Sequence, residues 1–367
     1  MIKVDNFLKI LNKNSINFYT GVPDSCLKNF TQELDKLDKN KHIIAVNEGS
    51  AVSLGIGYYL STKKIPCIYM QNSGLTNAFN PIISLAHQKV YRIPMCLIIG
   101  WRGAPNEKDE PQHKVKGKIT RELLRLLNIK YLELKTETDY RKLSKILRFF
   151  LKEKKIVAIL IRKQILISKK KNPSIKRSGK LIQKEKFYFY LLKLINKNSA
   201  IISSTGYTSR ELIFIRSKYN LKKGKDFYLV GGMGHTASVA GAYSIFKNRQ
   251  TICLDGDGSL LMHMGSIKTV ADNTGKNFKY ILLNNNSHES VGGQTTNANS
   301  VDFKKLSISL GFKKYLKINS NIKLKENLKS ILNSRGPVFA EVKIGSSIKE
   351  KLPRPKNLFS IKDEFIS

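Results

Sequence analysis

The alternation of short apolar runs with longer helical stretches constrains the fold of this chain more than any other feature. In the first half, strands are expected at 18–22, 65–71, 95–100 and 156–162, with helices such as 48–62 and 120–127 between them. In the second half, strands are expected at 200–204, 227–230, 251–255, 280–284 and 338–344, with helices at 209–217, 235–246 and 260–273. Because a parallel connection needs a crossover, this alternation predicts an α/β fold with doubly wound parallel sheets.

A polar interruption separates the two series. Residues 168–180, SKKKNPSIKRSGK, are basic and contain Pro and Gly, which is typical of a linker. A chain of 367 residues is long enough for two domains with their own cores. We expect a first domain over 1–166, a basic linker over 167–183 and a second domain over 184–367.

The formal net charge of +38 raises the possibility of a nucleic-acid partner. The basic residues are mostly Lys and are spread through nearly every segment, and no nucleic-acid-binding motif accompanies them. We therefore expect no nucleic-acid partner, although a basic field would attract an anionic small-molecule substrate.

Other features argue against metal-thiol, secreted and membrane proteins. No CxxC spacing links the four cysteines, and three of them lie in apolar runs that read as buried strands. Residues 1–13 form an amphipathic pattern without the continuous apolar core of a signal peptide. No apolar run approaches the ~18 residues that span a bilayer. We expect a cytoplasmic protein that does not enter the membrane.

The clearest chemical motif joins two neighbouring strand ends. Asp255-Gly256-Asp257-Gly258-Ser259 follows a predicted strand, and an Asn triplet that includes Asn285 ends the next one. Glycines at such a turn let the backbone approach a phosphate, and a helix start offers free N–H groups. Asp257 and Asn285 supply the oxygen ligands that Mg²⁺ prefers. The pair therefore predicts a site for Mg²⁺ and a phosphorylated ligand.

This pairing resembles the diphosphate-binding motif of thiamin-diphosphate-dependent enzymes. The resemblance implies a pyrimidine-binding and a diphosphate-binding domain, with thiamin diphosphate and Mg²⁺ as cofactors. It implies that the metal ligands are Asp257, Asn285 and the main-chain carbonyl of Ser287. It also implies cofactor contacts from Thr208, Gly258 and Ser259.

Members of this family also need a buried Glu for the aminopyrimidine ring and a bulky apolar residue that bends the cofactor. Glu48 follows the apolar run IIAV and opens a helix, although an acidic residue at a helix start also suits the helix dipole. In Gly231-Gly232-Met233-Gly234, the resemblance makes Met233 the bulky residue and the Gly231 carbonyl an acceptor for the 4′-amino group. A glycine turn with a core Met is the alternative.

No space exists between the motifs for the middle domain of larger family members, and two-domain decarboxylases of this kind act on phosphonopyruvate or sulfopyruvate. Blocks such as GVPDS, NEGSAVSLGIGY and GWRGAPNEKDEPQH resemble the phosphonopyruvate branch. This implies release of CO2 and phosphonoacetaldehyde, in the biosynthesis of phosphonates such as 2-aminoethylphosphonate. Candidates for proton transfer are Asp24, Gln112 and His113, where relatives carry an Asp and two His. Candidates for the second anionic group of the substrate are Asn72, Ser73, Arg102, Lys114, His288 and Ser290.

Three alternatives remain at this point. Sulfopyruvate decarboxylation would use the same fold and cofactor, and a thiamin-dependent carboligase would use a different reaction. A basic nucleic-acid-binding protein without catalysis would leave the Glu48, Met233 and Asp257 motifs unexplained. The resemblance further implies a homodimer or a dimer of dimers, with active sites at the subunit interface.

Overall fold

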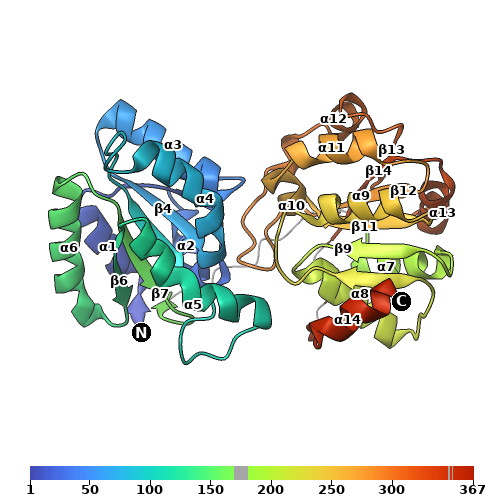
Figure 1. The fold of residues 1–367 in the computed structure, drawn as a ribbon, viewed down its shortest axis with the longest axis horizontal. Helices are drawn as coiled ribbons and strands as arrows, with labels where there is room; N and C mark the ends of the chain where they lie inside the picture. The colour runs from blue at the N-terminus through green and yellow to red at the C-terminus, as the bar shows by residue number, and fades with distance from the viewer. Residues whose placement is uncertain (169–180, 346–347, 349) are drawn as a thin grey trace. The chain divides into compact units, whose positions relative to one another are not determined.

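The computed structural model describes residues 1–168, 181–345, 348 and 350–367. The chain divides into two compact units, Met1–Ser174 and Ile175–Ser367. Each unit contains a six-stranded parallel sheet with helices on both faces (Figure 1), which confirms the expected α/β class. Residues 169–180 of the expected linker 167–183 lie outside the described residues, so the boundaries at 166 and 184 stay predictions.

The sheet of the first unit has the strand order β3-β2-β4-β5-β7-β6, and a separate parallel pair joins β1 to β8. Its strands are β1 Ile2–Lys3, β2 Phe18–Gly21, β3 His42–Ile44, β4 Pro66–Gln71, β5 Cys96–Gly100, β6 Lys130–Leu134, β7 Val157–Ile161 and β8 Leu166–Ile167. Its helices are α1 Val4–Lys13, α2 Lys28–Leu34, α3 Glu48–Thr62, α4 Leu75–Pro81, α5 Pro111–Leu126 and α6 Tyr140–Lys152.

Two apolar layers cover the faces of this sheet. One layer packs α1, α2 and α6 against the sheet through buried side chains such as Phe7, Phe30 and Leu147. The other packs α3, α4 and α5 through side chains such as Val52 and Leu124. The central strands read as continuous apolar runs because both of their faces are buried, as is usual in parallel sheets.

The sheet of the second unit has the order β10-β9-β11-β12-β14-β13. Its strands are β9 Ala200–Ser203, β10 Lys225–Tyr228, β11 Thr251–Gly256, β12 Phe278–Asn284, β13 Lys314–Ile318 and β14 Val338–Lys343. Its helices are α7 Lys184–Leu194, α8 Tyr207–Lys218, α9 Thr236–Phe246, α10 Asp257–Met262, α11 Gly265–Asn273, α12 Phe303–Ser309, α13 Leu324–Asn333 and α14 Leu358–Ile366. Helices α7, α8 and α13 pack on one face, and α9, α11 and α12 on the other.

The two units share one topology. If the strands of each six-stranded sheet are numbered along the chain, both sheets have the order 2-1-3-4-6-5, which the sequence did not reveal as a repeat. In such sheets ligands bind beyond the carboxyl ends of the strands, near the point where the order reverses. The corresponding ends are those of β2, β4 and β5 in the first unit and of β9, β11 and β12 in the second.

Three expectations about the elements were wrong in detail. The helix expected over 120–127 is the last part of α5, which begins at Pro111. The helix expected over 260–273 is two helices, because His263 has a non-helical backbone (φ −134°, ψ 49°) between α10 and α11. The strand expected at 227–230 lies at Lys225–Tyr228. The edge strands β3, β6 and β13 were not expected, since charged or polar residues interrupt their apolar pattern. Among the described residues, no helix is both long and apolar enough to cross a membrane.

Candidate active site

The Asp257 carboxylate lies at the carboxyl end of the second sheet. Strand β11 ends at Gly256, and Asp257 is the first residue of α10 with only 3% of its surface exposed. Its carboxylate accepts hydrogen bonds from the Thr296 hydroxyl and from the backbone N–H of Asn285. Burial raises the pKa of Asp257, because the carboxylate loses hydration. The fold thus brings Asp257 and Asn285 together, as expected for neighbouring parallel strands.

The loop after β12 holds the other two expected metal ligands. The Asn285 side chain donates from Nδ2 to Glu289 Oε2 at 3.0 Å and accepts at Oδ1 from the Ser287 N–H at 3.0 Å. The Ser287 hydroxyl donates to the Gly293 carbonyl at 3.0 Å. These contacts fix the loop that carries Asn285 and Ser287 beside Asp257.

Asp255 organises the turn from within the sheet, a role that the sequence analysis missed. It is 1% exposed, and its carboxylate accepts hydrogen bonds from the hydroxyls of Tyr280 (2.8 Å) and Ser259. Ser259 in turn accepts at Oγ from the Gly234 N–H at 3.0 Å. Asp255 therefore connects the GDG turn to the GGMG turn. The only sequence signal was an acidic residue that ends an otherwise apolar strand.

Close packing surrounds Gly258. A Cβ at this position would lie 2.8 Å from His288 Cε1 and 3.2 Å from Met233 Cε. The expected apolar residue Met233 is half-buried and thus lies against the GDG turn. Burial lowers the pKa of His288 to about 4, so its imidazole is neutral near pH 7. Glycine at position 258 therefore lets His288 and Met233 pack closely against the GDG turn.

The remaining residues expected in the second unit lie around the same strand ends. Gly231 is half-buried, and Thr208 lies in the first turn of α8. Ser290 is exposed, and its Oγ would lie 3.4 Å from a Cβ built on Gly206. The Thr208 carbonyl accepts a hydrogen bond from the Tyr188 hydroxyl at 3.3 Å, and the cofactor and substrate roles of Thr208 and Ser290 stay predictions.

In the first unit, Glu48 occupies the position expected of the buried carboxyl group. It is the first residue of α3 and is 5% exposed. Its Oε2 accepts from Asn77 Nδ2 at 2.9 Å, and its Oε1 would lie 2.2 Å from a Cβ on Gly74. Asn47 caps the helix by accepting from the Ser50 N–H at 2.8 Å. Glycine at position 74 thus leaves the space that the Glu48 carboxyl group occupies.

A polar chain runs from Asp24 along the end of β4. Asp24 is fully buried, and its Oδ1 accepts from Gln71 Nε2 at 2.5 Å while its Oδ2 accepts from the Cys26 N–H at 2.8 Å. The Ser73 hydroxyl donates to Gln71 Oε1 at 2.8 Å. Burial raises the pKa of Asp24, although these hydrogen bonds oppose the rise. The two expected residues Asp24 and Ser73 therefore belong to one network through Gln71.

Arg102 and Asn72, both expected to bind the substrate, already have buried partners. Arg102 donates from Nε and Nη2 to the two carboxylate oxygens of Asp109, at 2.8 and 2.6 Å. It also donates from Nη1 to Ser25 Oγ at 3.0 Å. Asn72 donates from Nδ2 to the Arg102 carbonyl and to Thr120 Oγ1, both at 2.9 Å. These contacts indicate that Arg102 and Asn72 shape the site, and their contact with substrate stays a prediction.

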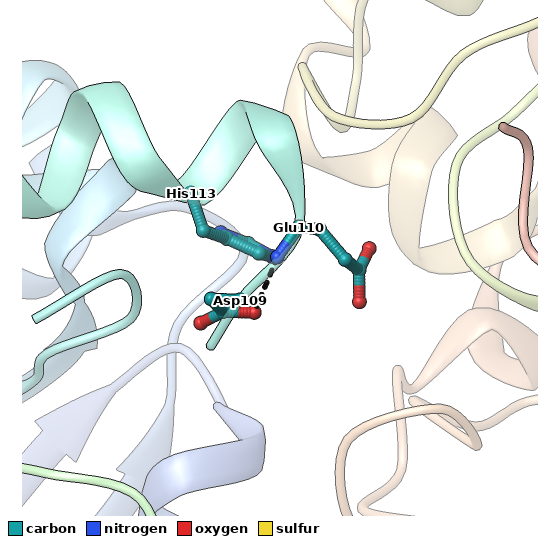
Figure 2. Close-up of side chains that lie close together, drawn as sticks. All are labelled: Asp109, Glu110 and His113. Carbon is teal, nitrogen blue, oxygen red and sulfur yellow. Dashed lines mark hydrogen bonds between the residues drawn. The ribbon is translucent and has the colours of Figure 1, made fainter. Parts of the chain in front are cut away.

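His113 lies at the start of α5 beside two carboxylates. Figure 2 shows the His113 ring next to the Asp109 carboxylate. Ligand atoms of these three residues lie within 4.8 Å of one another. Arg102 pairs with Asp109 and also lies 3.5 Å from Glu110, so the charge that a metal would supply is already present. Burial lowers the pKa of His113 to about 4, and Gln112 Nε2 donates to Glu110 Oε2 at 2.6 Å.

Comparison with known proteins agrees with both halves of this geometry. Residues 3–122 match the family model for the thiamine pyrophosphate enzyme N-terminal TPP binding domain, and residues 213–342 match the model for the C-terminal TPP binding domain. The chain is therefore a thiamin-diphosphate-dependent enzyme, and thiamin diphosphate is its cofactor.

Three curated relatives narrow this class. Phosphonopyruvate decarboxylase of Streptomyces hygroscopicus is 30% identical over 97% of this chain and 91% of that protein. The enzyme of the same name from Streptomyces viridochromogenes is 29% identical over 97% and 92%. Sulfopyruvate decarboxylase of Methanosarcina acetivorans is 25% identical over 86% and 84%. The chain belongs to the phosphonopyruvate decarboxylase family and is a decarboxylase of a pyruvate analogue.

Proposed function

We propose that this protein decarboxylates 3-phosphonopyruvate to phosphonoacetaldehyde and CO2, with thiamin diphosphate and Mg²⁺, in the biosynthesis of a phosphonate such as 2-aminoethylphosphonate. The convergence of Asp257 and Asn285 at the ends of β11 and β12 carries the proposal. The two Streptomyces relatives, which match nearly the whole chain, support this substrate over sulfopyruvate. The Methanosarcina relative keeps sulfopyruvate as the alternative to be tested.

The donor set beside Gly258 fits a hard divalent cation. Asp257 offers a buried carboxylate, Asn285 an amide oxygen and Ser287 a backbone carbonyl, and Mg²⁺ prefers oxygen ligands of these kinds. The diphosphate of the cofactor would complete the coordination beside a glycine that leaves no room for a side chain. When bound, the cofactor supplies the electron sink for loss of CO2.

Glu48 is proposed to hold a proton at the N1′ atom of the cofactor's aminopyrimidine ring. Its carboxyl group is 5% exposed and has a fixed partner in Asn77. A buried carboxyl group with one hydrogen-bond donor beside it can share a proton with a ring nitrogen, because water does not compete for it. This role requires the carboxyl group itself, which an amide cannot replace.

Asp24 is proposed to donate the proton that the reaction requires after CO2 has left. It is fully buried, and burial favours its protonated form, so it can carry a proton at a pH where an exposed Asp cannot. His113 has its pKa lowered to about 4 and is therefore neutral near pH 7, which suits an acceptor. The Gln112 amide is bound to Glu110, and we assign it an orienting role only.

The second anionic group of the substrate is proposed to bind Lys116. Arg102 is neutralised by Asp109, and Lys114 is exposed. Lys116 is half-buried on the same face of α5 as Thr120, one helical turn away. Within the described part of the chain, no carboxylate lies in ion-pair distance of Lys116. Burial lowers the pKa of Lys116 and the charge of Glu48 opposes this, which puts its ammonium group near the proposed centre.

The active form is proposed to be a homodimer or a dimer of dimers. A hollow of about 1090 Å³ lies along α3 and α4 and includes Leu54, Tyr58 and Leu85 in its lining. Leu54 and Leu85 are 39% and 37% exposed. Contiguous apolar patches on a protein surface often mark contacts with another protein. A second subunit is the proposed cover.

The substrate assignment can be tested by following ³¹P spectra of phosphonopyruvate incubated with the full-length protein, thiamin diphosphate and Mg²⁺. Conversion to phosphonoacetaldehyde, with a kcat/KM about tenfold or more above that for sulfopyruvate, is the expected result. A higher kcat/KM for sulfopyruvate would contradict the substrate assignment and retain the decarboxylase.

A further inference from the structure

The Asn285 side chain is oriented by a residue that the proposed function does not use. Its Nδ2 donates to Glu289 Oε2 at 3.0 Å. A carboxylate can only accept hydrogen bonds, so Glu289 selects the NH2 end of the amide and turns Oδ1 to the opposite side. There Oδ1 accepts one hydrogen bond from the Ser287 N–H, and its second lone pair remains for a cation. Glu289 thus decides which end of Asn285 faces the proposed metal.

Glu289 is held in place by a buried cation. Lys184, the first residue of α7, is 7% exposed, and its Nζ lies 3.0 Å from Glu289 Oε2. The same Nζ lies 3.2 Å from Glu211 Oε1, and the Glu211 side chain is 1% exposed. Glu211 also accepts from the Tyr188 hydroxyl at 3.4 Å. A continuous polar chain therefore leads from the core of the second unit, through Lys184, to Asn285.

The positive charge of Lys184 matters as much as its position. Glu289 is only 18% exposed, and an unbalanced carboxylate at that depth is costly. Without Lys184 the carboxylate would be drawn towards any cation bound at Asp257 and would leave Asn285. With Lys184 in place, Glu289 remains a hydrogen-bond acceptor for Asn285.

We propose that Glu289 and Lys184 are positioning residues for Asn285 and thereby set the affinity of the protein for Mg²⁺. The inference rests on the proposed function, because it takes Asn285 as a metal ligand. Residues that hold a metal ligand typically contribute about 10–100-fold to metal affinity. Glu289 contacts Asn285 directly, and Lys184 acts on Asn285 through its contact with Glu289.

The experiment is a calorimetric titration of Mg²⁺ into the full-length protein saturated with thiamin diphosphate. Glu289→Ala removes the acceptor and keeps the pair of Lys184 with Glu211, so the core of this unit stays paired. We expect it to raise the Kd for Mg²⁺ about tenfold or more. Lys184→Met should raise the same Kd, and Lys184→Arg should restore part of the loss. Lys186→Met, on the exposed side of α7, is the matched control and should leave the Kd unchanged.

Asp257→Asn separates failure of this inference from failure of the proposed metal site. If Asp257→Asn abolishes Mg²⁺ binding while Glu289→Ala keeps the Kd within about twofold of wild type, the positioning role is wrong and the metal site stands. If Asp257→Asn leaves Mg²⁺ binding unchanged, the proposed metal site itself is wrong. A Kd raised in Glu289→Ala, with circular dichroism identical to wild type, supports the inference.

Discussion

Arg102 and Asp109 form a buried, bidentate ion pair, with side chains 9% and 1% exposed. The pair connects the loop before α5 to the GVPDS turn, because Arg102 also donates to Ser25 Oγ. Because Asp109 and Ser25 occupy the guanidinium group of Arg102, these donors are already used within the protein. Two hydrogen bonds to one carboxylate fix the guanidinium plane.

Asp109→Asn should destabilise the protein by about 3 kcal/mol, since it removes the bidentate counter-charge of the buried guanidinium and leaves only the longer contact with Glu110 among the described ion pairs of Arg102. The free energy of unfolding from urea denaturation measures this loss. Asp272→Asn, which breaks an exposed pair with Lys268, is the matched control and should cost less than about 1 kcal/mol. Equal losses for the two variants would refute a structural role for the Arg102–Asp109 pair.

Gly74→Ala should lower kcat about tenfold or more, because a Cβ at Gly74 would lie 2.2 Å from Glu48 Oε1 and would displace the carboxyl group. Gly265→Ala is the control, since Gly265 begins α11 in the second unit and a Cβ there meets nothing within 4 Å. Steady-state CO2 release and circular dichroism check the pair of variants. An unchanged kcat in folded Gly74→Ala would show that the Glu48 position is not critical.

Lys116→Met should raise KM for phosphonopyruvate about tenfold or more, as a hydrogen bond to a charged group contributes about 1.5–3 kcal/mol. Lys114→Met, on the exposed side of α5, should leave KM unchanged. The inhibition constant of inorganic phosphate, which carries the same kind of anionic group, gives a second measurement. Equal KM values for the two variants would remove Lys116 from the substrate site.

Three buried histidines should contribute stability that falls as pH is lowered from about 6.5 towards 5. Burial lowers the pKa of His42, His113 and His288 to about 4, whereas an unfolded His titrates near 6.5. At these three histidines the unfolded state therefore binds more protons in this range, so their contribution to stability rises with pH, whereas the raised pKa of buried carboxyl groups such as Asp24 acts in the opposite direction. Urea denaturation at several pH values measures the slope, and His113→Gln should reduce it. An equal slope in His113→Gln and in wild type would be inconsistent with a neutral buried His113.

The sequence predicted the central strands and the edge strand β10, displaced by two residues, but missed the edge strands β3, β6 and β13. Central parallel strands are covered on both faces and read as continuous apolar runs, such as CLIIG in β5. The edge strands β6 and β13, KYLEL and KYLKI, carry charged residues because part of each strand faces water. The split between α10 and α11 also escaped prediction, although Gly265 begins α11 two residues after His263.

Much of the site followed from spacing, but its supporting contacts did not. Asp257 and Asn285 meet because the carboxyl ends of adjacent parallel strands lie at one edge of a sheet, which can be read from the chain. Asn77, Asp109 and Lys184 reach their partners through tertiary packing, across up to 105 residues in the Lys184–Glu289 contact. No local pattern specifies such pairs. Arg102 was expected to bind substrate because its buried partner Asp109 could not be identified from sequence.

Thiamin-dependent decarboxylation with Glu48 as the proton-holding group is tested most directly by CO2 release from phosphonopyruvate by wild-type protein and Glu48→Gln, with and without thiamin diphosphate and Mg²⁺. For the proposed decarboxylation we predict turnover by wild type only when both cofactors are present, and a loss of about 100-fold or more in Glu48→Gln at saturating cofactor, in line with the loss of a general acid–base group. Turnover by Glu48→Gln at the wild-type rate, or by wild type without added cofactor after dialysis against a chelator, would contradict it.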